Sequence, residues 1–418
     1  MKTLLVFLSI FLSLFAPKMG LVDFSLLGTF SACILLALSN DIKIPILYVQ
    51  LATLTLLVLS YSIIVYAFYN GLDAQIIQRN VRAFVSLIFL GLAFYNSKCN
   101  SKMIINCIKV SIMLHSFVIL AQILFPAIQS IMAPWVGYTK TIFILRAFGL
   151  TNGFDTAGYF CIIGIIISYW SLIRKKDFWQ NYLLLLICAL ASFFTSRNVM
   201  IITILFVLAI TTWMLFNRSR MVKATGLFNI IAGAYIFYYF VGPLIISSIP
   251  SLEQYSSLFG TSVEFNIEES FSKGSADTLS NMFILPSSLK SLFGAGYNNP
   301  DSDVGYVKII YMIGILGLLI IIFIHLLVFL KVFQIRRLTL QAVKRNRGCN
   351  IYSRLNDSLV LSDTIITFFV LLPWLNVKGL YLFSRGFHEF VIIIVFTILS
   401  CLRIDSSPSK NEEEIIFS

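Results

Sequence analysis

Runs of about 20 apolar residues recur along the whole chain and are separated by short polar segments. A run of that length crosses the hydrocarbon core of a bilayer as an α-helix, because lipid offers no other partner to the backbone polar groups. The pattern predicts an all-α, polytopic integral membrane protein with about twelve transmembrane helices, forming one domain over residues 1–418. The expected helices lie at 4–16, 21–39, 44–68, 81–95, 103–125, 157–173, 181–195, 199–216, 224–249, 306–330, 358–375 and 387–403.

The distribution of lysine and arginine orients these helices. Cytoplasmic loops of membrane proteins carry an excess of both residues. With the N-terminus in the cytoplasm, nineteen of the 31 lysines and arginines fall on the cytoplasmic side, eleven fall outside, and Lys109 lies within a helix. We therefore expect both termini in the cytoplasm, extracytoplasmic loops at 126–156 and 250–305, and a basic cytoplasmic loop at 331–357. The second extracytoplasmic loop is the large one, and long loops often carry function.

Composition supports the membrane class and excludes others. Apolar residues make up 58% of the chain and charged residues 12%, with a mean hydropathy of +0.90, whereas a soluble domain carries about 25% charged residues. The net charge of +12 is spread over many short loops, so topology explains it better than nucleic-acid binding. The seven cysteines include no C-x-x-C pair, so we expect no disulfide framework, no metal site and no cofactor.

Five arginines lie within a few residues of the expected extracytoplasmic helix ends. Arginine is unfavourable near hydrocarbon, but it binds phosphate groups bidentately and stays charged. One explanation is that each side chain extends to the surface from a helix end. The other is that together they form a site for a lipid-linked diphosphate. The five are Arg79, Arg82, Arg146, Arg197 and Arg385.

Two further residues are candidates for a general base on the same side. Asp155 lies in the segment RAFGLTNGFDTAGYF, which interrupts the apolar pattern at 146–160. Its carboxylate could accept a proton, or it could form a turn or cap the next helix. His388, in SRGFHEF, lies between Arg385 and Glu389 at the outer mouth of the last expected helix. His115 and His325 fall within helices, where interhelical hydrogen bonding is the expected role.

Three segments in order carry a resemblance to a known family. They are RAFGLTNGFDTAGYF, the tight turn SFFTSRN, and SLFGAGYNNPDSDVGYVKIIYMIGILGLLIIIF, which ends the large loop. Over roughly residues 140–330 this arrangement resembles the membrane-bound O-antigen polymerase and ligase family. The large loop at 250–305 contains no histidine, whereas the ligase branch carries one there, so the polymerase branch is favoured.

The resemblance implies a bacterial cytoplasmic-membrane glycosyltransferase that uses undecaprenyl-diphosphate-linked oligosaccharides on the outer face. It would polymerise repeat units into a surface polysaccharide such as O-antigen, capsule or exopolysaccharide, and a chain-length regulator is a further candidate partner. Arg146 and Arg197 are the first candidates for diphosphate ligands, with Arg79, Arg82 and Arg385 behind them.

Two alternatives stay open. A ligase would transfer the same donor to a lipid or protein acceptor. A flippase would move lipid-linked oligosaccharide across the membrane, and such transporters tend to carry charges in mid-membrane and internal repeats. The chain has no obvious repeat, and its clearest charged residues inside helices are Lys109 and Asp363.

Overall fold

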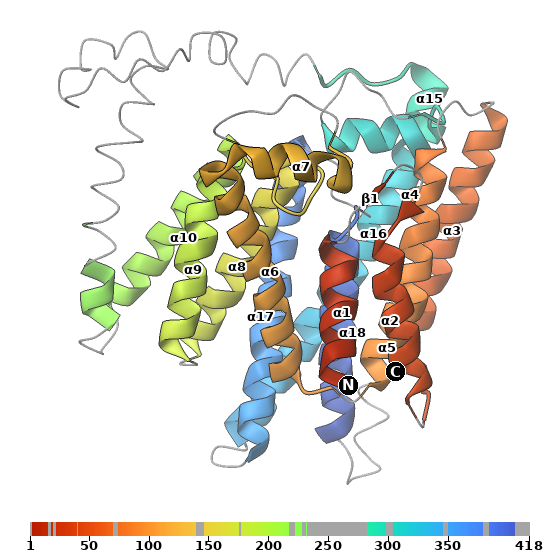
Figure 1. Cartoon of the computed structure of the whole chain (residues 1–418). Coiled ribbons are helices and arrows are strands. Elements are labelled where there is room, and N and C mark those ends of the chain that lie inside the picture. The colour runs from red at the N-terminus through yellow and green to blue at the C-terminus, as the bar shows by residue number, and fades with distance from the viewer. Residues whose placement is uncertain are drawn as a thin grey trace, which may run out of the picture. The chain divides into compact units, whose positions relative to one another are not determined.

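The computed structural model (Figure 1) describes fourteen stretches of the chain. These are residues 2–15, 18–19, 22–39, 41–69, 74–97, 99–138, 146–174, 177–216, 222–227, 231, 282–297, 304–345, 350–378 and 384–405. The backbone groups into two compact units. Unit 1 comprises Met1–Thr203 and Ile284–Ser418, and unit 2 comprises Ile204–Phe283.

The described residues are helical almost throughout. The first half contains α1 (Lys2–Phe15), α2 (Ser25–Ala37), α3 (Ile46–Phe68), α4 (Gln75–Ser86), the π-helix η1 (Leu87–Gly91), α5 (Leu92–Asn96), α6 (Ser101–Leu124), α7 (Pro126–Val136), α8 (Phe154–Ile173), α9 (Phe178–Phe193) and α10 (Arg197–Leu215). The second half contains α15 (Ser288–Phe293), α16 (Gly305–Arg345), α17 (Asn350–Lys378) and α18 (Phe387–Asp405). The two-residue strands β1 (Lys18–Met19) and β2 (Val22–Asp23) pair antiparallel between α1 and α2.

The structure confirms an all-helical, multi-pass membrane protein. Within the described stretches, six helices are long and apolar enough to cross a bilayer, and five shorter apolar helices accompany them. These eleven helices overlap eleven of the expected ranges, because a long apolar run determines both the helix and its place; α16 extends well beyond its expected end. The twelfth range, 224–249, lies mostly outside the described residues.

Two expected loops contain helix instead. The segment expected as a loop at 126–156 includes the eleven-residue helix α7. The basic segment expected as a loop at 331–357 is mostly helical, since α16 continues to Arg345 and α17 begins at Asn350. The reason in α16 is that Val332, Ile335 and Thr339 are all buried, so the apolar face continues at helical spacing beyond the membrane-length run.

Unit 1 has a buried interior and an apolar exterior. Residues 157–168 of α8 and 355–365 of α17 are buried without interruption, as in a helix surrounded by others. By contrast, α3 and α16 expose large apolar side chains along their length, which is the surface that lipid requires. On α3 these include Leu57, Ile64 and Phe68, and on α16 they include Leu319, Phe323 and Leu330.

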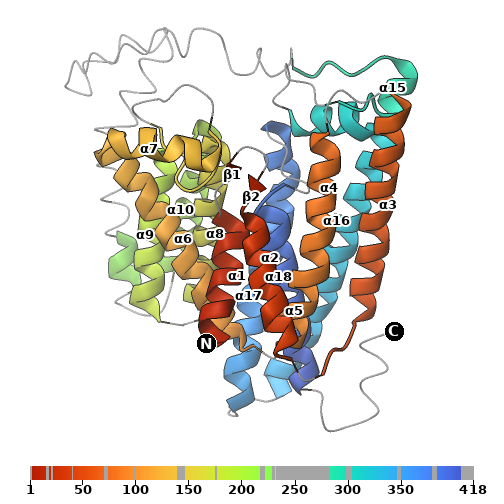
Figure 2. The ribbon, with the colours of Figure 1, turned by 45° about the vertical axis from the view of Figure 1, so that its right-hand side comes forward.

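Helices that follow one another in the chain often run in opposite directions, as α1 and α2, α8 and α9, and α16 and α17 do (Figure 1, Figure 2). α1 runs toward the end that carries β1, α7 and the start of α8, and α18 starts at that end and runs back beside α1. We call this the α7 end of unit 1. The start of α1 and the finish of α18 both lie at the opposite end.

The end of α15 packs against a kink in α16. Gly314 interrupts the helix with φ 68° and ψ 180°. A Cβ on Gly314 would lie 2.3 Å from the carbonyl oxygen of Leu292, so the two backbones are in direct contact. Ala295 N–H donates to the Tyr311 carbonyl at 2.7 Å, and Tyr61 of α3 donates to the Phe293 carbonyl at 2.9 Å.

At the opposite end of unit 1, one buried carboxylate joins three helices. Asp363 of α17 is 2% exposed and pairs with Arg174, which follows α8, at 2.6 Å and with Arg336 of α16. Nearby, Lys109 of α6 donates to Ser171 of α8 at 2.9 Å and also to Asn181 of α9. The charges that were conspicuous inside the expected helices, Lys109 and Asp363, therefore bind partners between helices.

Candidate functional site

The segment Arg146–Thr156 enters α8 at the α7 end, and side chains of α6 bind its backbone. Gln122 accepts from the Gly149 N–H at 2.9 Å and donates to the Gly149 carbonyl at 3.1 Å. His115, two turns earlier on the same face of α6, accepts from the Leu150 N–H through Nδ1 at 3.1 Å. Because Nδ1 accepts, the ring is neutral and Nε2 carries the proton, which it donates to the Ala157 carbonyl at 3.1 Å.

Helix α7 covers the beginning of the same segment. Gln129 donates to the carbonyl of Arg146 at 2.6 Å. Tyr138, just after α7, stacks on Phe148 with ring centroids 4.7 Å apart. Burial raises the pKa of Tyr138, and the positive charge of Arg146 acts in the opposite direction. The Arg146 guanidinium is therefore close enough to Tyr138 for its charge to act on the phenol.

The turn that carries Arg197 lies directly against this segment. Ala147 N–H donates to the carbonyl of Phe194 at 2.7 Å. A Cβ on Gly158 would lie 2.3 Å from Thr195 Oγ1, so the first turn of α8 can meet the turn only because residue 158 is glycine. Arg146 and the backbone of Arg197 thus belong to two adjoining segments. The structure does not describe the Arg197 side chain.

Asp155 lies in the first turn of α8. The cap of that helix is Gly153, without a side-chain cap bond, so Asp155 is not the N-cap. A carboxylate in the first turn is favoured by the helix dipole. Its Oδ1 atom is buried and has no hydrogen-bond partner in the structure.

Arg385 reaches the same segment from the start of α18. It lines a cavity of about 20 Å³ together with Asn152, Thr156 and Phe160. Gly386 has φ +82°, and a Cβ there would lie 2.7 Å from Phe160 of α8. The cavity has room for about one water molecule. A lipid-linked sugar would therefore have to bind over the surface at this end rather than inside the cavity.

A second polar cluster adjoins Arg385 on the α4 side. Glu389 is 1% exposed, pairs with Arg82 at 3.5 Å and accepts from Ser86 at 3.1 Å. It also accepts from the Gly386 N–H at 2.7 Å. Arg79 lies one turn before Arg82 on α4 and is half-buried. Arg82 and Glu389 neutralise each other, so Arg82 has a structural partner as well as a place near the candidate site.

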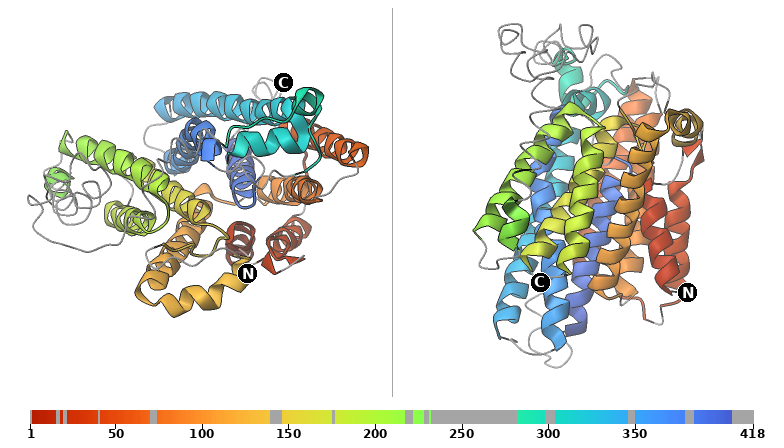
Figure 3. Two further views of the ribbon diagram at one scale, coloured as in Figure 1. Left: turned by 90° about the horizontal axis from the view of Figure 1, so that it is seen from above. Right: turned by 60° about the vertical axis from the view of Figure 1, so that its left-hand side comes forward.

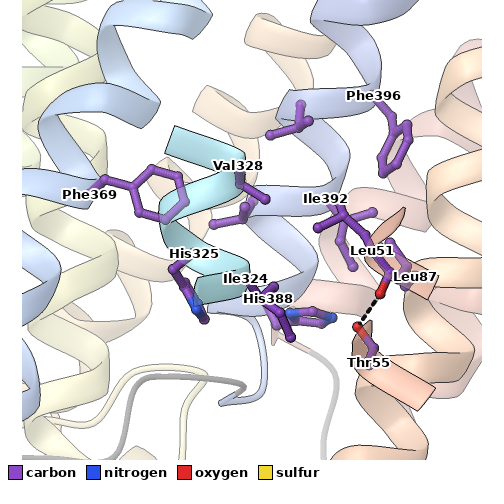
Figure 4. Close-up of a pocket in the computed structure, with 12 residues that line it drawn as sticks. Leu51, Thr55, Leu87, Ile324, His325, Val328, Phe369, His388, Ile392 and Phe396 are labelled. Atoms are coloured by element: carbon purple, nitrogen blue, oxygen red, sulfur yellow. Dashed lines mark hydrogen bonds between the residues drawn. The ribbon is translucent and has the colours of Figure 1, made fainter. Parts of the chain in front are cut away.

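His388 is directed elsewhere. Its Nε2 bonds to the Ala83 carbonyl at 3.1 Å. The ring lines a cavity with His325, Thr55 and otherwise apolar side chains of α3, α16, α17 and α18 (Figure 4). That cavity has a volume of about 30 Å³, room for about two water molecules. His388 and Asp155, the two candidate bases, thus do not line one cavity.

In the part of the chain that the structure describes, the positive charge beside the start of α8 comes from arginine side chains. Helices α4, α8, α16 and α18 begin at the α7 end, whereas α1, α3, α6, α9 and α17 finish there (Figure 1), so the helix dipoles oppose one another. Arg146 and Arg385 add two charges beside the start of α8. Among the described residues, no group of three or more His, Cys, Asp or Glu side chains could hold a metal ion.

Sequence reasoning expected an interhelical hydrogen bond from His115, which the structure confirms, but it did not identify the other residues that fix this geometry. His115, Gln122 and Gln129 bind the backbone of the arginine-bearing segment, and Glu389 binds Arg82. A polar residue repeated every seven positions in an apolar run, as His115 and Gln122 are, indicates one helix face with a buried polar partner. The partner itself is distant in sequence and cannot be read from that spacing. No protein-family model matches the chain, and no curated protein matches it.

Proposed function

We propose that the protein is a membrane glycosyltransferase that polymerises undecaprenyl-diphosphate-linked oligosaccharide repeat units into a surface polysaccharide. The protein would lie in the bacterial cytoplasmic membrane with twelve crossings and both termini in the cytoplasm. The bias of lysine and arginine supports this orientation, as does the position of the start of α1 and the finish of α18 at one end of unit 1. The α7 end would then face outward.

One observation carries the proposal: the Arg146 segment and the turn before Arg197 are joined at the α7 end. The Ala147–Phe194 hydrogen bond of 2.7 Å connects them, and Arg385 lines a cavity with residues of the same segment. Arg146 and Arg385 would thereby flank one surface, and the Arg197 backbone follows the adjoining turn. Such a surface suits a diphosphate, which two or three guanidinium groups bind in place of a metal ion.

The chemistry that this surface would support is glycosyl transfer. The bond between the anomeric carbon and the diphosphate oxygen breaks, and the electron pair leaves with the diphosphate. An acceptor hydroxyl oxygen forms the new bond to that carbon and loses its proton to a base. Fixed arginines stabilise the charge that develops on the leaving diphosphate. Asp155 is the better candidate base, because its Oδ1 has no hydrogen-bond partner, whereas His388 bonds to a backbone carbonyl.

The test is polymerisation by purified protein in vesicles supplied with lipid-linked repeat units. Arg146→Ala and Arg197→Ala are expected to lower the rate at least about 100-fold, since each removes charge stabilisation of the leaving group. Arg337→Ala, an exposed position near the opposite end of unit 1, is the matched control and keeps the wild-type rate. Wild-type product lengths in both site variants would refute the assignment.

The same assay separates the alternatives. Wild-type protein that forms a ladder of products in vesicles without a transmembrane gradient supports the polymerase. Transfer of a preformed chain to a lipid or protein acceptor, without lengthening, indicates the ligase. Movement of lipid-linked repeats across the vesicle wall with no new glycosidic bond indicates the flippase.

A further inference from the structure

Helix α7 carries an exposed apolar face that contains no charge. The helix sequence is PAIQSIMAPWV. Ile131 is 66% exposed and Trp135 is 54% exposed, while Gln129, Ala133 and Val136 are buried against unit 1. One side of α7 therefore packs on the protein, and the other presents an isoleucine and a tryptophan outward. Exposure of such an apolar face to water would be unfavourable.

The orientation of α7 differs from that of the membrane-length helices. It lies across the α7 end of unit 1, along its edge, whereas α6 runs along the bundle (Figure 3). With eleven residues, α7 is too short to cross a bilayer. A short helix that lies flat and presents a tryptophan outward suits the membrane interface, where tryptophan is enriched.

The exposed face of α7 continues a lipid-facing surface. On α6, Leu114 and Phe117 are exposed at 40% and 47%, and Leu124 at the end of that helix is 73% exposed. Phe125, at the corner before α7, is 63% exposed. The surface thus passes from the side of a long apolar helix onto α7 without a charged residue in between, so the same medium, lipid, would cover both.

A second tryptophan marks the other boundary. Trp179 is in the first turn of α9 and is 59% exposed, and α9 begins at the end of unit 1 opposite α7 (Figure 1). Between these two ends runs α8, whose 20 residues rise about 30 Å, the thickness of the hydrocarbon core. Tryptophan is enriched at both membrane interfaces, so Trp135 and Trp179 fit the two surfaces of one bilayer.

From these observations we infer that α7 is an interfacial helix bound in one surface of the bilayer, and that it holds Arg146 at the depth of the lipid phosphates. The connection to Arg146 is short: Gln129, on the buried side of α7, donates to the Arg146 carbonyl at 2.6 Å. If the proposed diphosphate site is correct, this depth restricts the site to diphosphates carried by a lipid.

The experiment measures how deeply Trp135 lies in lipid and does not depend on the enzymatic activity. Full-length protein and a Trp135→Phe variant are reconstituted in phosphatidylcholine vesicles, and the difference between their fluorescence reports Trp135. Vesicles contain lipid brominated either near the headgroup or near the end of the acyl chain. For an interfacial helix about 5–10 Å into the headgroup and acyl boundary, the difference signal is lost with the shallow label and largely kept with the deep one.

A Trp179→Phe variant measured in the same way is the matched control, because Trp179 is expected to show the same shallow quenching at the other interface. Quenching of Trp135 by aqueous acrylamide, with none by either bromolipid, would mean that α7 faces water. No quenching by any agent would mean that protein covers the helix, whether this chain or a second copy. Either result, with Trp179 quenched normally, overturns the inference.

Discussion

Gly149 is one of the residues through which α6 binds the arginine-bearing segment. Its φ of +56° is a left-handed conformation, and an added Cβ would lie 2.5 Å from Cε1 of His115. The His115 ring in turn stacks on Phe15 of α1 at 4.7 Å, so it cannot move aside freely. Glycine is required at this position both for the backbone conformation and for the space.

Gly149→Ala is expected to destabilise the protein by about 1–3 kcal/mol, the range for a left-handed non-glycine residue. The measurement is the thermal unfolding midpoint in detergent, which should fall. Gly153→Ala is the matched control in the same segment. Gly153 has an extended backbone with φ −168°, and a Cβ there would meet only Thr156 Oγ1 at 3.8 Å. Equal midpoints for the two variants would contradict the role assigned to Gly149.

Asp363 illustrates a charge that is buried because it has two partners. Replacing it with asparagine leaves Arg174 and Arg336 without their counter-ion. We expect a loss of up to about 3 kcal/mol, the lower end for a broken buried pair, because Arg336 is 30% exposed and partly solvated. The exposed Asp177→Asn, close to Arg174 in the chain, should change stability by less than about 0.5 kcal/mol. Chemical denaturation of both variants in micelles compares them.

At the scale of elements, the kink in α16 is a docking point for α15. Gly314 and Gly294 both have positive φ, and a Cβ on Gly294 would lie 2.7 Å from Cα of Ile313. The contact leaves no room for a side chain on either residue. The glycines therefore allow the final part of the large loop to return to the membrane-length helix at one defined place.

Gly314→Ala is expected to detach α15 while the long helices stay folded. Its Cβ would lie 2.5 Å from the Gly294 nitrogen, which forces the two backbones apart. Hydrogen exchange should then lose protection at the Ala295 N–H, which donates to Tyr311. The adjacent Ile315→Ala, at a partly exposed position, should leave that amide protected. Unchanged exchange in the glycine variant would show that the docking tolerates a side chain.

Sequence pattern was informative for long helices and weak for the elements between them. Residues 154–173 are apolar on all sides, so α8 was expected within a few residues. Helix α7 was missed, because eleven residues without charge give neither a membrane-length run nor a polar face. The extension of α16 was missed because Arg336 and Arg337 resemble a basic loop, whereas Arg336 pairs with Asp363 across helices.

On the scale of the whole molecule, the orientation of unit 1 makes a prediction for intact cells. If the α7 end faces outward, a cysteine at exposed Asn152 should react with a membrane-impermeant thiol reagent added outside. A cysteine at Asp177, at the opposite end, should react only after the cells are made permeable. The described native cysteines are buried or half-buried, and a wild-type sample measures the background. Labelling of position 177 alone in intact cells would reverse the orientation.

The candidate site was predictable in its charges but not in its connections. Arg146, Asp155 and Arg385 were recognisable because each is costly beside hydrocarbon. That Arg82 pairs with Glu389, or that His388 lines a cavity with His325, depends on contacts between residues that are far apart in the chain. Nothing in local pattern specifies which of two helix faces meets which neighbour, so these partners appear only once the helices are packed.

The hydrogen bonds to the backbone of the Arg146 segment reduce the conformational entropy that the segment would lose on binding a ligand. Four donor–acceptor contacts from Gln122, His115 and Gln129 fix residues 146–150 before any ligand arrives. A loop that ordered itself on binding would lose about 1–2 kcal/mol of favourable free energy for each residue immobilised. Here that loss is incurred during folding instead, so an anion meeting Arg146 would retain most of the attraction between the charges as affinity.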